Sequence, residues 1–167
     1  MQVTGVQTCA LPICKNSIAA GVDASTAITA ENAIALGKSA QADGSNTIAI
    51  GHQAQVLGTV NNANTIVIGN TSTATDSNAA VILGNGNNTK TSIDTLQFGS
   101  KNTAESSRAV ALIGGLNNTK DGLASNIIGI NNSLNASSNS SIIGINNSVA
   151  GSTFINVSGY NNTITGS

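Results

Sequence analysis

A glycine recurs along this chain at a nearly constant spacing, and this recurrence constrains the fold more than any other feature. Each of these glycines follows a short apolar segment, and from position 69 to position 159 they keep a period of 15 residues. The earlier intervals are 16, 14 and 18 residues. The positions are Gly21, Gly37, Gly51, Gly69, Gly84, Gly99, Gly114, Gly129, Gly144 and Gly159. A period this short is typical of a solenoid, in which each repeat stacks on its neighbours.

The apolar segments before these glycines have the character of β-strands. Segments 48–50, 66–68 and 81–83 are short, rich in β-branched residues and bounded by Gly and Asn. Helices are disfavoured, because β-branched side chains lose rotamer freedom in a helix and a glycine would fall inside every helix of ordinary length. The repeat therefore predicts an all-β fold, a parallel β-solenoid with coils of 14–16 residues.

A second segment in the early coils alternates between small apolar and polar residues. After Gly37, the side chains of Ala40 and Ala42 point to one side of the expected strand, whereas Gln41 and Asp43 point to the other. This strand has one face in water. Each coil is therefore expected to contain two strands joined by two tight turns.

The first strand of each coil is apolar on both faces, and this predicts an oligomer. One face covers the interior of the solenoid, and the other needs a cover from outside the chain. Aromatic residues make up only 2% of the chain, so a single narrow coil buries little surface by itself. The residues expected at the interface between chains are Ile34, Ala35, Leu36, Ala49, Val67 and Ile82.

Two segments carry the repeat most clearly. They read Asn-Thr-Ile-Ala-Ile-Gly at 46–51 and Asn-Thr-Ile-Val-Ile-Gly at 64–69. This pattern resembles the head domain of trimeric autotransporter adhesins, the YadA-like heads, whose recurring motif is close to N-S-V-A-I-G-x-x-S followed by A-x-A-x-G. The candidate adhesive motif is Asn46, Thr47, Ile48, Ala49, Ile50, Gly51, Asn64, Thr65, Ile66, Val67, Ile68 and Gly69.

The resemblance implies a left-handed parallel β-roll, with three identical chains wrapped about one axis at the tip of a surface fibre. It implies attachment to host matrix proteins, to cells or to neighbouring bacteria, at the bacterial cell surface. The outer-membrane anchor of such proteins would belong to a part of the chain that is not present. No cofactor is implied, and the ligand is not identified.

Residues 14–167 are expected to form one repeat domain. Residues 30–85 resemble the YadA-like motif most closely, and residues 86–167 keep the rhythm as variant 15-residue coils. The variant coils contain Asn pairs such as Asn131-Asn132 and Asn146-Asn147. Because Asn tolerates positive φ and serves turns well, we expect these pairs to lie at corners and to stack into ladders. The chain is expected to be a fragment truncated at both ends.

Residues 1–13 do not continue this pattern. The segment from Val3 to Ile13 resembles the translation of a common sequencing-adapter oligonucleotide, and the reading phase also agrees with Cys14. It lacks the basic residues and the apolar core of a secretory signal, and its cysteines have no zinc or redox spacing. We therefore exclude residues 1–13 from the fold as a sequence artefact.

The remaining chemistry of the chain argues against an enzyme. Charged residues make up 8% of the chain and the net charge is −1, which disfavours nucleic acid as a partner. The acidic residues are scattered beside turns, and His52 stands alone, so no catalytic pair, cofactor site or metal site is predicted.

Two alternative functions use similar architectures. A trimeric phage fibre or spike could be built from the same rolls. An ice-binding solenoid would carry a flat array of Thr on one wall, but here the polar wall contains Gln41, Asp43, Gln55 and Asn135. We therefore rank the ice-binding alternative below the adhesin head and the phage fibre.

Overall fold

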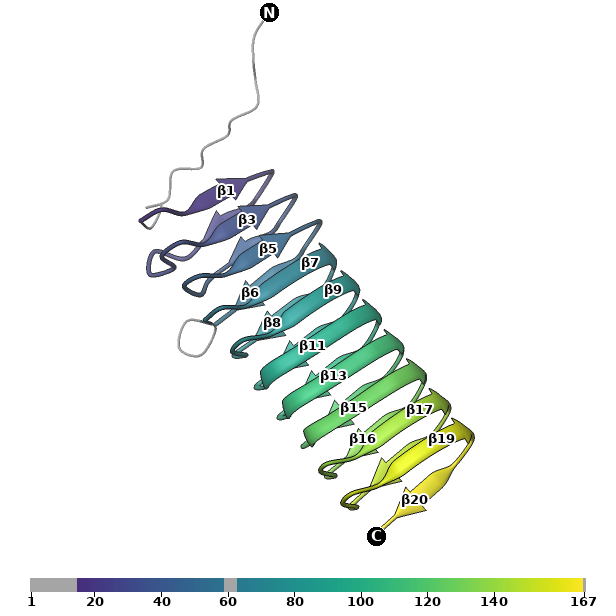
Figure 1. The fold of residues 1–167 in the computed structure, drawn as a ribbon. Coiled ribbons are helices and arrows are strands. Elements are labelled where there is room, and N and C mark those ends of the chain that lie inside the picture. The colour runs from purple at the N-terminus through teal and green to yellow at the C-terminus, as the bar shows by residue number, and fades with distance from the viewer. Residues whose placement is uncertain (1–14, 59–62, 167) are drawn as a thin grey trace, which may run out of the picture.

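The computed structural model describes residues 15–58 and 63–166, and every regular element in these ranges is a β-strand (Figure 1). The strands form two 10-stranded sheets. Sheet A contains β1 (Ile18–Ala20), β3 (Ile34–Leu36), β5 (Ile48–Ile50), β7 (Ile66–Asn70), β9 (Val81–Asn85), β11 (Ile93–Ser100), β13 (Arg108–Gly115), β15 (Leu123–Ile130), β17 (Ser141–Ile145) and β19 (Asn156–Tyr160). Sheet B contains β2 (Ser25–Thr26), β4 (Gln41–Ala42), β6 (Gln55–Leu57), β8 (Thr73–Thr75), β10 (Asn88–Lys90), β12 (Thr103–Glu105), β14 (Asn118–Lys120), β16 (Ser133–Asn135), β18 (Ser148–Ala150) and β20 (Thr163–Thr165).

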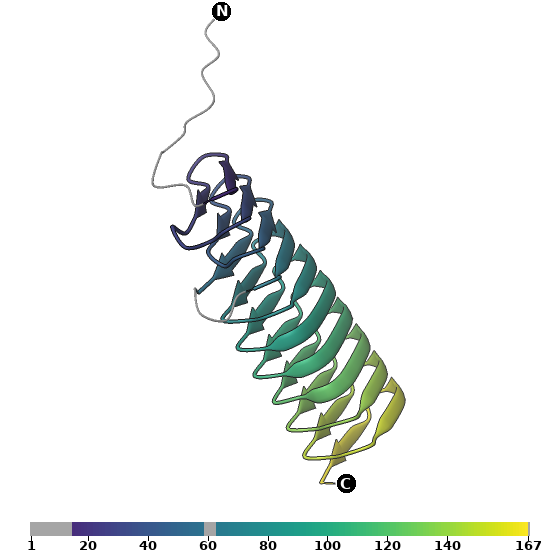
Figure 2. The same cartoon turned by 60° about the vertical axis from the view of Figure 1, so that its left-hand side comes forward.

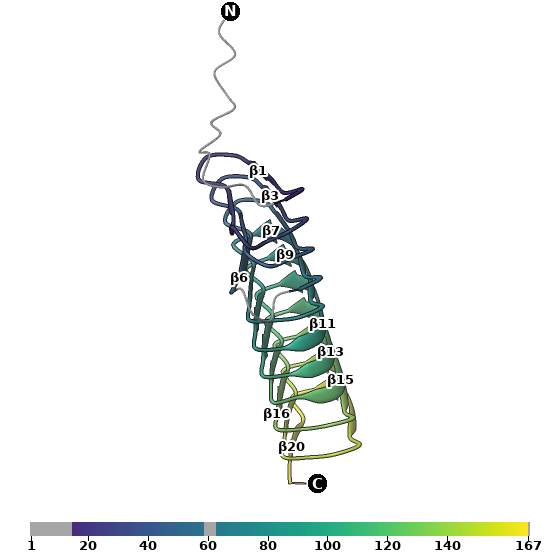
Figure 3. The same ribbon diagram turned by 90° about the vertical axis from the view of Figure 1, so that its left-hand side faces the viewer.

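Each strand pairs in parallel with the equivalent strands of the coils before and after it. Between β7 and β9, for example, Ile66 lies beside Val81 and Gly69 lies beside Gly84. The 15-residue period of the sequence therefore corresponds to one coil, and residues one period apart pair with each other in the sheet. Figure 2 and Figure 3 show the coils stacked along one axis. The predicted all-β parallel solenoid is confirmed. The prediction that residues 1–13 do not belong to the fold concerns a segment outside the described residues.

The recurring glycines form a column at which successive strands approach too closely for a side chain. Gly114 has a φ of 115°, and a methyl group added there would collide with the carbonyl oxygen of Gly129. The same collision with the next coil's carbonyl recurs at Gly69 and Gly84. The period of glycine in the sequence thus records one structural requirement repeated in every coil.

Left-handed residues form the corners of the coils. In one coil, Thr71, Asp76 and Ala79 have φ values of 53°, 46° and 52°. The backbone N–H group of each donates a hydrogen bond to the coil before it, to His52, Leu57 and Ala63 at 2.9, 3.0 and 3.0 Å respectively.

The two expected turns fit only the first coils of the chain. In residues 31–45 only Asn32 and Ser39 are left-handed among the non-glycine residues, whereas each coil from Thr71 onward has a further corner at the position of Asp76. This extra corner divides the segment that connects each strand of sheet B to the next strand of sheet A into two parts. The corners also include the first Asn of each predicted pair, such as Asn131 and Asn146.

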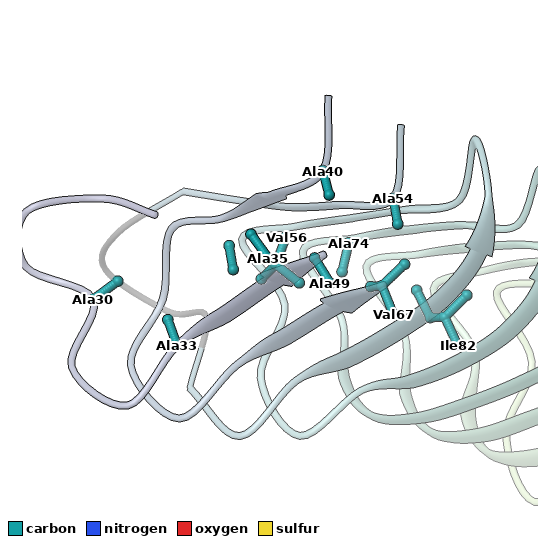
Figure 4. Packing of buried hydrophobic residues seen from close by; sticks show 11 residues of the cluster. Ala30, Ala33, Ala35, Ala40, Ala49, Ala54, Val56, Val67, Ala74 and Ile82 are labelled. Atoms are coloured by element: carbon teal, nitrogen blue, oxygen red, sulfur yellow. The ribbon is translucent and has the colours of Figure 1, made fainter. Parts of the chain in front are cut away.

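The interior is narrow and divided into two apolar clusters. The first cluster is rich in alanine, and Figure 4 shows its side chains pointing into the space between the sheets. The second contains larger residues, among them Leu112, Ile127 and Leu134. Between the clusters lies fully buried Gln97, whose Nε2 donates to the Asn88 carbonyl at 2.9 Å. The change from one cluster to the other falls between Ile82 and Ala104, after the sequence changes at position 86 from the YadA-like motif to its variant.

A ladder of asparagine side chains lines the inside of one corner. It is formed by Asn87, Asn102, Asn117, Asn132, Asn147 and Asn162. The Oδ1 atom of each residue accepts a hydrogen bond from the backbone N–H group of the next, for example at 3.0 Å from Asn102 to Asn87. The Nδ2 atom of Asn87 donates to the Gly99 carbonyl at 2.9 Å. The predicted Asn ladders are therefore present, and this one, buried from Asn87 to Asn147, joins each coil to the next over residues 87–162.

Candidate interaction surfaces

The outward side of sheet A carries an extended apolar surface, which we call the apolar face. It consists of three columns of side chains that stack in register from coil to coil. The first column is Ile34, Ile48, Ile66, Val81, Leu96, Ala111, Asn126, Ser141 and Asn156. The second is Leu36, Ile50, Ile68, Leu83, Phe98, Ile113, Ile128, Ile143 and Ser158. The third, after the glycines, is Asn70, Asn85, Ser100, Gly115, Ile130, Ile145 and Tyr160.

The second column makes the apolar face continuous. Every residue in it from Leu36 to Ile143 is a large hydrophobic residue. Phe98 is 55% exposed and Ile143 is 50% exposed. Single exposed hydrophobic residues are common on soluble proteins, but a contiguous row over eight coils marks an interaction surface.

The outward side of sheet B is polar, and we call it the polar face. Its side chains include Thr73 and Thr75 on β8 and Thr163 and Thr165 on β20. In the middle of this face, Glu105 lies in register between Lys90 and Lys120 on the neighbouring strands. Charges of opposite sign thus alternate along the solenoid, an arrangement that favours this register over a shifted one.

One acidic group on the polar face has a perturbed pKa. Burial raises the pKa of Asp43 above its ordinary value, because desolvation penalises the carboxylate. A hydrogen bond of 2.6 Å from Gln41 Nε2 to Asp43 Oδ2 opposes this effect by stabilising the charged form. Desolvation is the larger influence, so this half-buried carboxyl group of the solenoid wall is protonated more readily than an ordinary aspartate.

The residues of the candidate adhesive motif occupy five kinds of position, of which the Asn corners and the buried Thr residues are the first two. Asn46 and Asn64 are exposed left-handed corners. Thr47 and Thr65 are buried, and their Oγ1 atoms donate to the carbonyls of Gly44 and Ser77 at 2.6 and 3.0 Å.

The other motif residues divide between the apolar face, the core and the glycine column. Ile48, Ile50, Ile66 and Ile68 face outward in the first two columns of sheet A. Ala49 and Val67 are in the core, and Gly51 and Gly69 belong to the glycine column. The Thr, Ala and Val positions of the motif are buried in the single chain, whereas the side chains of the Asn and Ile positions point outward.

Four of the six residues expected at the interface between chains are inside the solenoid. Ala35, Ala49, Val67 and Ile82 are each 0% exposed in the single chain and belong to its core. Their assignment to the interface was wrong, because side chains alternate along a strand and these four point to the inner sheet face. Ile34 and Leu36 do face outward, in the first and second columns.

Other outward residues of these columns were missed as individual contacts. They include Ile66 and Ile68 on β7 and Leu96 and Phe98 on β11. Side-chain size was the available signal in these strands: the narrow interior accepts alanine at positions 35 and 49, while larger Ile and Leu residues flank them.

No reactive cluster accompanies these surfaces in residues 15–58 and 63–166. His52 is exposed and its Nδ1 lies 3.0 Å from Asn70 Oδ1. In the described residues no group of three or more His, Cys, Asp and Glu side chains could hold a metal ion. The same part of the chain contains no helix long and apolar enough to cross a membrane.

These features define a class of protein: a parallel β-solenoid of coils about 15 residues long, with one apolar and one polar outer face. Residues 29–54 match the family model of the YadA head domain repeat, in 2 copies. The matched segment contains β3, β4 and β5 and the turn that follows. The resemblance to YadA-like head repeats is therefore confirmed for these coils. A comparison with curated proteins finds no match.

Proposed function

We propose that this chain is a segment of an adhesin head, in which three copies pack their apolar faces around a common axis at the tip of a bacterial surface fibre. The observation that carries the proposal is the second column of sheet A. It presents a large hydrophobic residue in eight consecutive coils from Leu36 to Ile143. A row of this length is unfavourable in water and is expected to be covered by another protein surface.

The repeat favours another copy of the same chain as that cover. Strands of one sheet lie about 4.8 Å apart, so the row offers an apolar group at this spacing over most of its length. A partner must present groups at the same interval to pack against every coil. An identical solenoid aligned in parallel meets this requirement without distortion, and cyclic symmetry is the usual arrangement of identical subunits.

Adhesion is then expected at the surfaces that remain in water, which are the polar face and the exposed corners. They carry hydroxyl, amide and charged groups at regular intervals, such as Thr73, Asn88 and Glu105. The match of residues 29–54 to the YadA head repeat supports a function in attachment to matrix proteins, cells or other bacteria. Catalysis is not part of this proposal.

The oligomeric state tests the structural half of the proposal. Light scattering on the full chain, coupled to size-exclusion chromatography, should give three times the chain mass of 16.5 kDa. Ile68→Asp places a carboxylate in the second column and should abolish the assembly, because an unpaired buried charge is strongly unfavourable. Thr73→Asp on the polar face is the matched control and should leave the mass unchanged. A monodisperse monomer of the wild-type chain at micromolar concentration would contradict the proposal.

Binding tests the functional half. The assembled protein should bind immobilised collagen, fibronectin or laminin, or cultured cells, in a saturable manner. The Ile68→Asp variant should lose avidity because it presents one binding surface instead of three. An intact trimer that binds none of these surfaces would refute the adhesive role while leaving the assembly in place.

A further inference from the structure

The apolar surface of sheet A changes position between the two halves of the solenoid. In the first column, Ile66, Val81 and Leu96 are followed by Ala111, Asn126 and Ser141. The column thus changes from apolar to polar along one uninterrupted line of paired strands.

The third column changes in the opposite direction. It begins with Asn70, Asn85 and Ser100, and it ends with Ile130, Ile145 and Tyr160. These last three side chains are 50%, 43% and 64% exposed. The two changes compensate for one another: two of the three columns are apolar in each half. We call these two adjacent apolar columns the apolar stripe.

The crossover occurs in a single coil. On β13 the second column keeps Ile113, while the flanking positions are the small residues Ala111 and Gly115. Before this coil the stripe occupies the first and second columns, and after it the second and third. The displacement is two residues along the strand, or roughly 6–7 Å.

The backbone turns the third column away from the first. Its residues follow the glycine column, where φ is 115° at Gly114 and 133° at Gly129, and the next residues are the left-handed corners at Leu116 and Asn131. Figure 1 shows β11, β13 and β15 curving along their length. A shift of the stripe toward the third column is therefore also a rotation of the apolar surface about the solenoid axis.

We propose that neighbouring copies of this chain contact one another through the first and second columns up to Phe98, and through the second and third columns from Ile128 onward. The partner is a second copy in parallel and in register, and the inference rests on the proposed assembly of the head. In a parallel pair, both chains change columns at the same level. In an antiparallel pair, the polar first column of one half would face the apolar first column of the other. Each chain thus changes the part of sheet A that meets its neighbour within one coil, at β13.

Thiol protection in the assembled protein tests this inference, with Cys9→Ser and Cys14→Ser as the background. The four positions chosen are Leu96, Ser100, Asn126 and Ile130, which are all exposed in the single chain. Protection of a cysteine at any of them must therefore come from a partner. We expect the Leu96→Cys and Ile130→Cys variants to react with a charged maleimide roughly tenfold more slowly than the Ser100→Cys and Asn126→Cys variants.

The possible outcomes separate the inference from the proposed function. Protection of the Asn126→Cys variant in a trimer would mean that the chains contact one another through the same columns throughout. This result would contradict the proposed shift of columns but not the assembly. Four fast reactions in a monomeric sample overturn both. The Ser100→Cys and Asn126→Cys variants leave every apolar side chain in place, so they decide the question even if the other two variants fail to assemble.

Discussion

Asn132 and Asn147 are joined by their side chains across two successive coils. The Oδ1 atom of Asn132 accepts hydrogen bonds from the backbone N–H group and from Nδ2 of Asn147, both at 3.1 Å. The Nδ2 atom of Asn132 donates to the Gly144 carbonyl at 2.8 Å. One buried amide thus satisfies a buried N–H group and a part-buried carbonyl of the next coil, and the relationship repeats from Asn87 to Asn162.

Replacing Asn132 with alanine should therefore destabilise the solenoid strongly. The change leaves the buried Asn147 N–H group and the part-buried Gly144 carbonyl without this partner, at a cost of about 2–4 kcal/mol. Chemical denaturation followed by circular dichroism measures the loss. Asn118→Ala is the matched control, because Asn118 is exposed on the polar face, and it should change the stability by less than about 0.5 kcal/mol. Equal effects of the two substitutions would contradict the role of the ladder.

Gly114→Ala should disrupt the stacking of coils. The added methyl group would run into the backbone of Gly129, which cannot move without breaking the sheet. We expect a loss of more than about 3 kcal/mol, or no soluble folded protein.

Gly151→Ala is the control for Gly114→Ala. Gly151 is also left-handed, with a φ of 61°, but a methyl group there would have only the Gly166 nitrogen nearby, at 4.0 Å. Its substitution should cost about 1 kcal/mol. A Gly114→Ala protein as stable as the Gly151→Ala protein would show that the column of glycines tolerates side chains.

Thr119→Val should stabilise the protein. The Thr119 side chain is fully buried, and its Oγ1 atom has no hydrogen-bond partner among the described residues. Valine has nearly the same shape and removes the unsatisfied hydroxyl, for an expected gain of about 1–2 kcal/mol. Thr103→Val, at an outward position of the polar face, should change little. A loss of stability in the Thr119→Val variant would mean that the hydroxyl is solvated in the folded state.

Asp43→Asn should raise stability at neutral pH and not at acid pH. Because the pKa of Asp43 is raised in the folded state, folding favours the protonated acid. The contribution of this group to stability is complete below its ordinary pKa of about 3.8 and is lost as the pH rises through the raised value. Asparagine can still accept the hydrogen bond from Gln41. Thermal unfolding at pH 7 and pH 3 should show a higher midpoint for the variant at pH 7 only; an equal shift at both would contradict this account.

The sequence alone determined the repeating part of this architecture. The spacing of Gly69, Gly84 and Gly99 could only arise from stacked coils, since the same close backbone approach recurs in each of them. The β-branched segments identified the strands of sheet A, and the Asn pairs identified a corner and its ladder. These features are local, so the chemistry of a few neighbouring residues is enough to specify them.

The tertiary structure decided which side of each strand meets the core. Val67 and Ile68 are both apolar, yet Val67 is 0% exposed and Ile68 is 40% exposed. Hydrophobicity could not distinguish them, because a strand that is apolar on both faces has no polar residue to mark its outer side. Only the closure of the coil on sheet B selects the inner face. The same closure turns Ile130 outward beside Ile128, so the path of the apolar face becomes visible only when all coils are stacked.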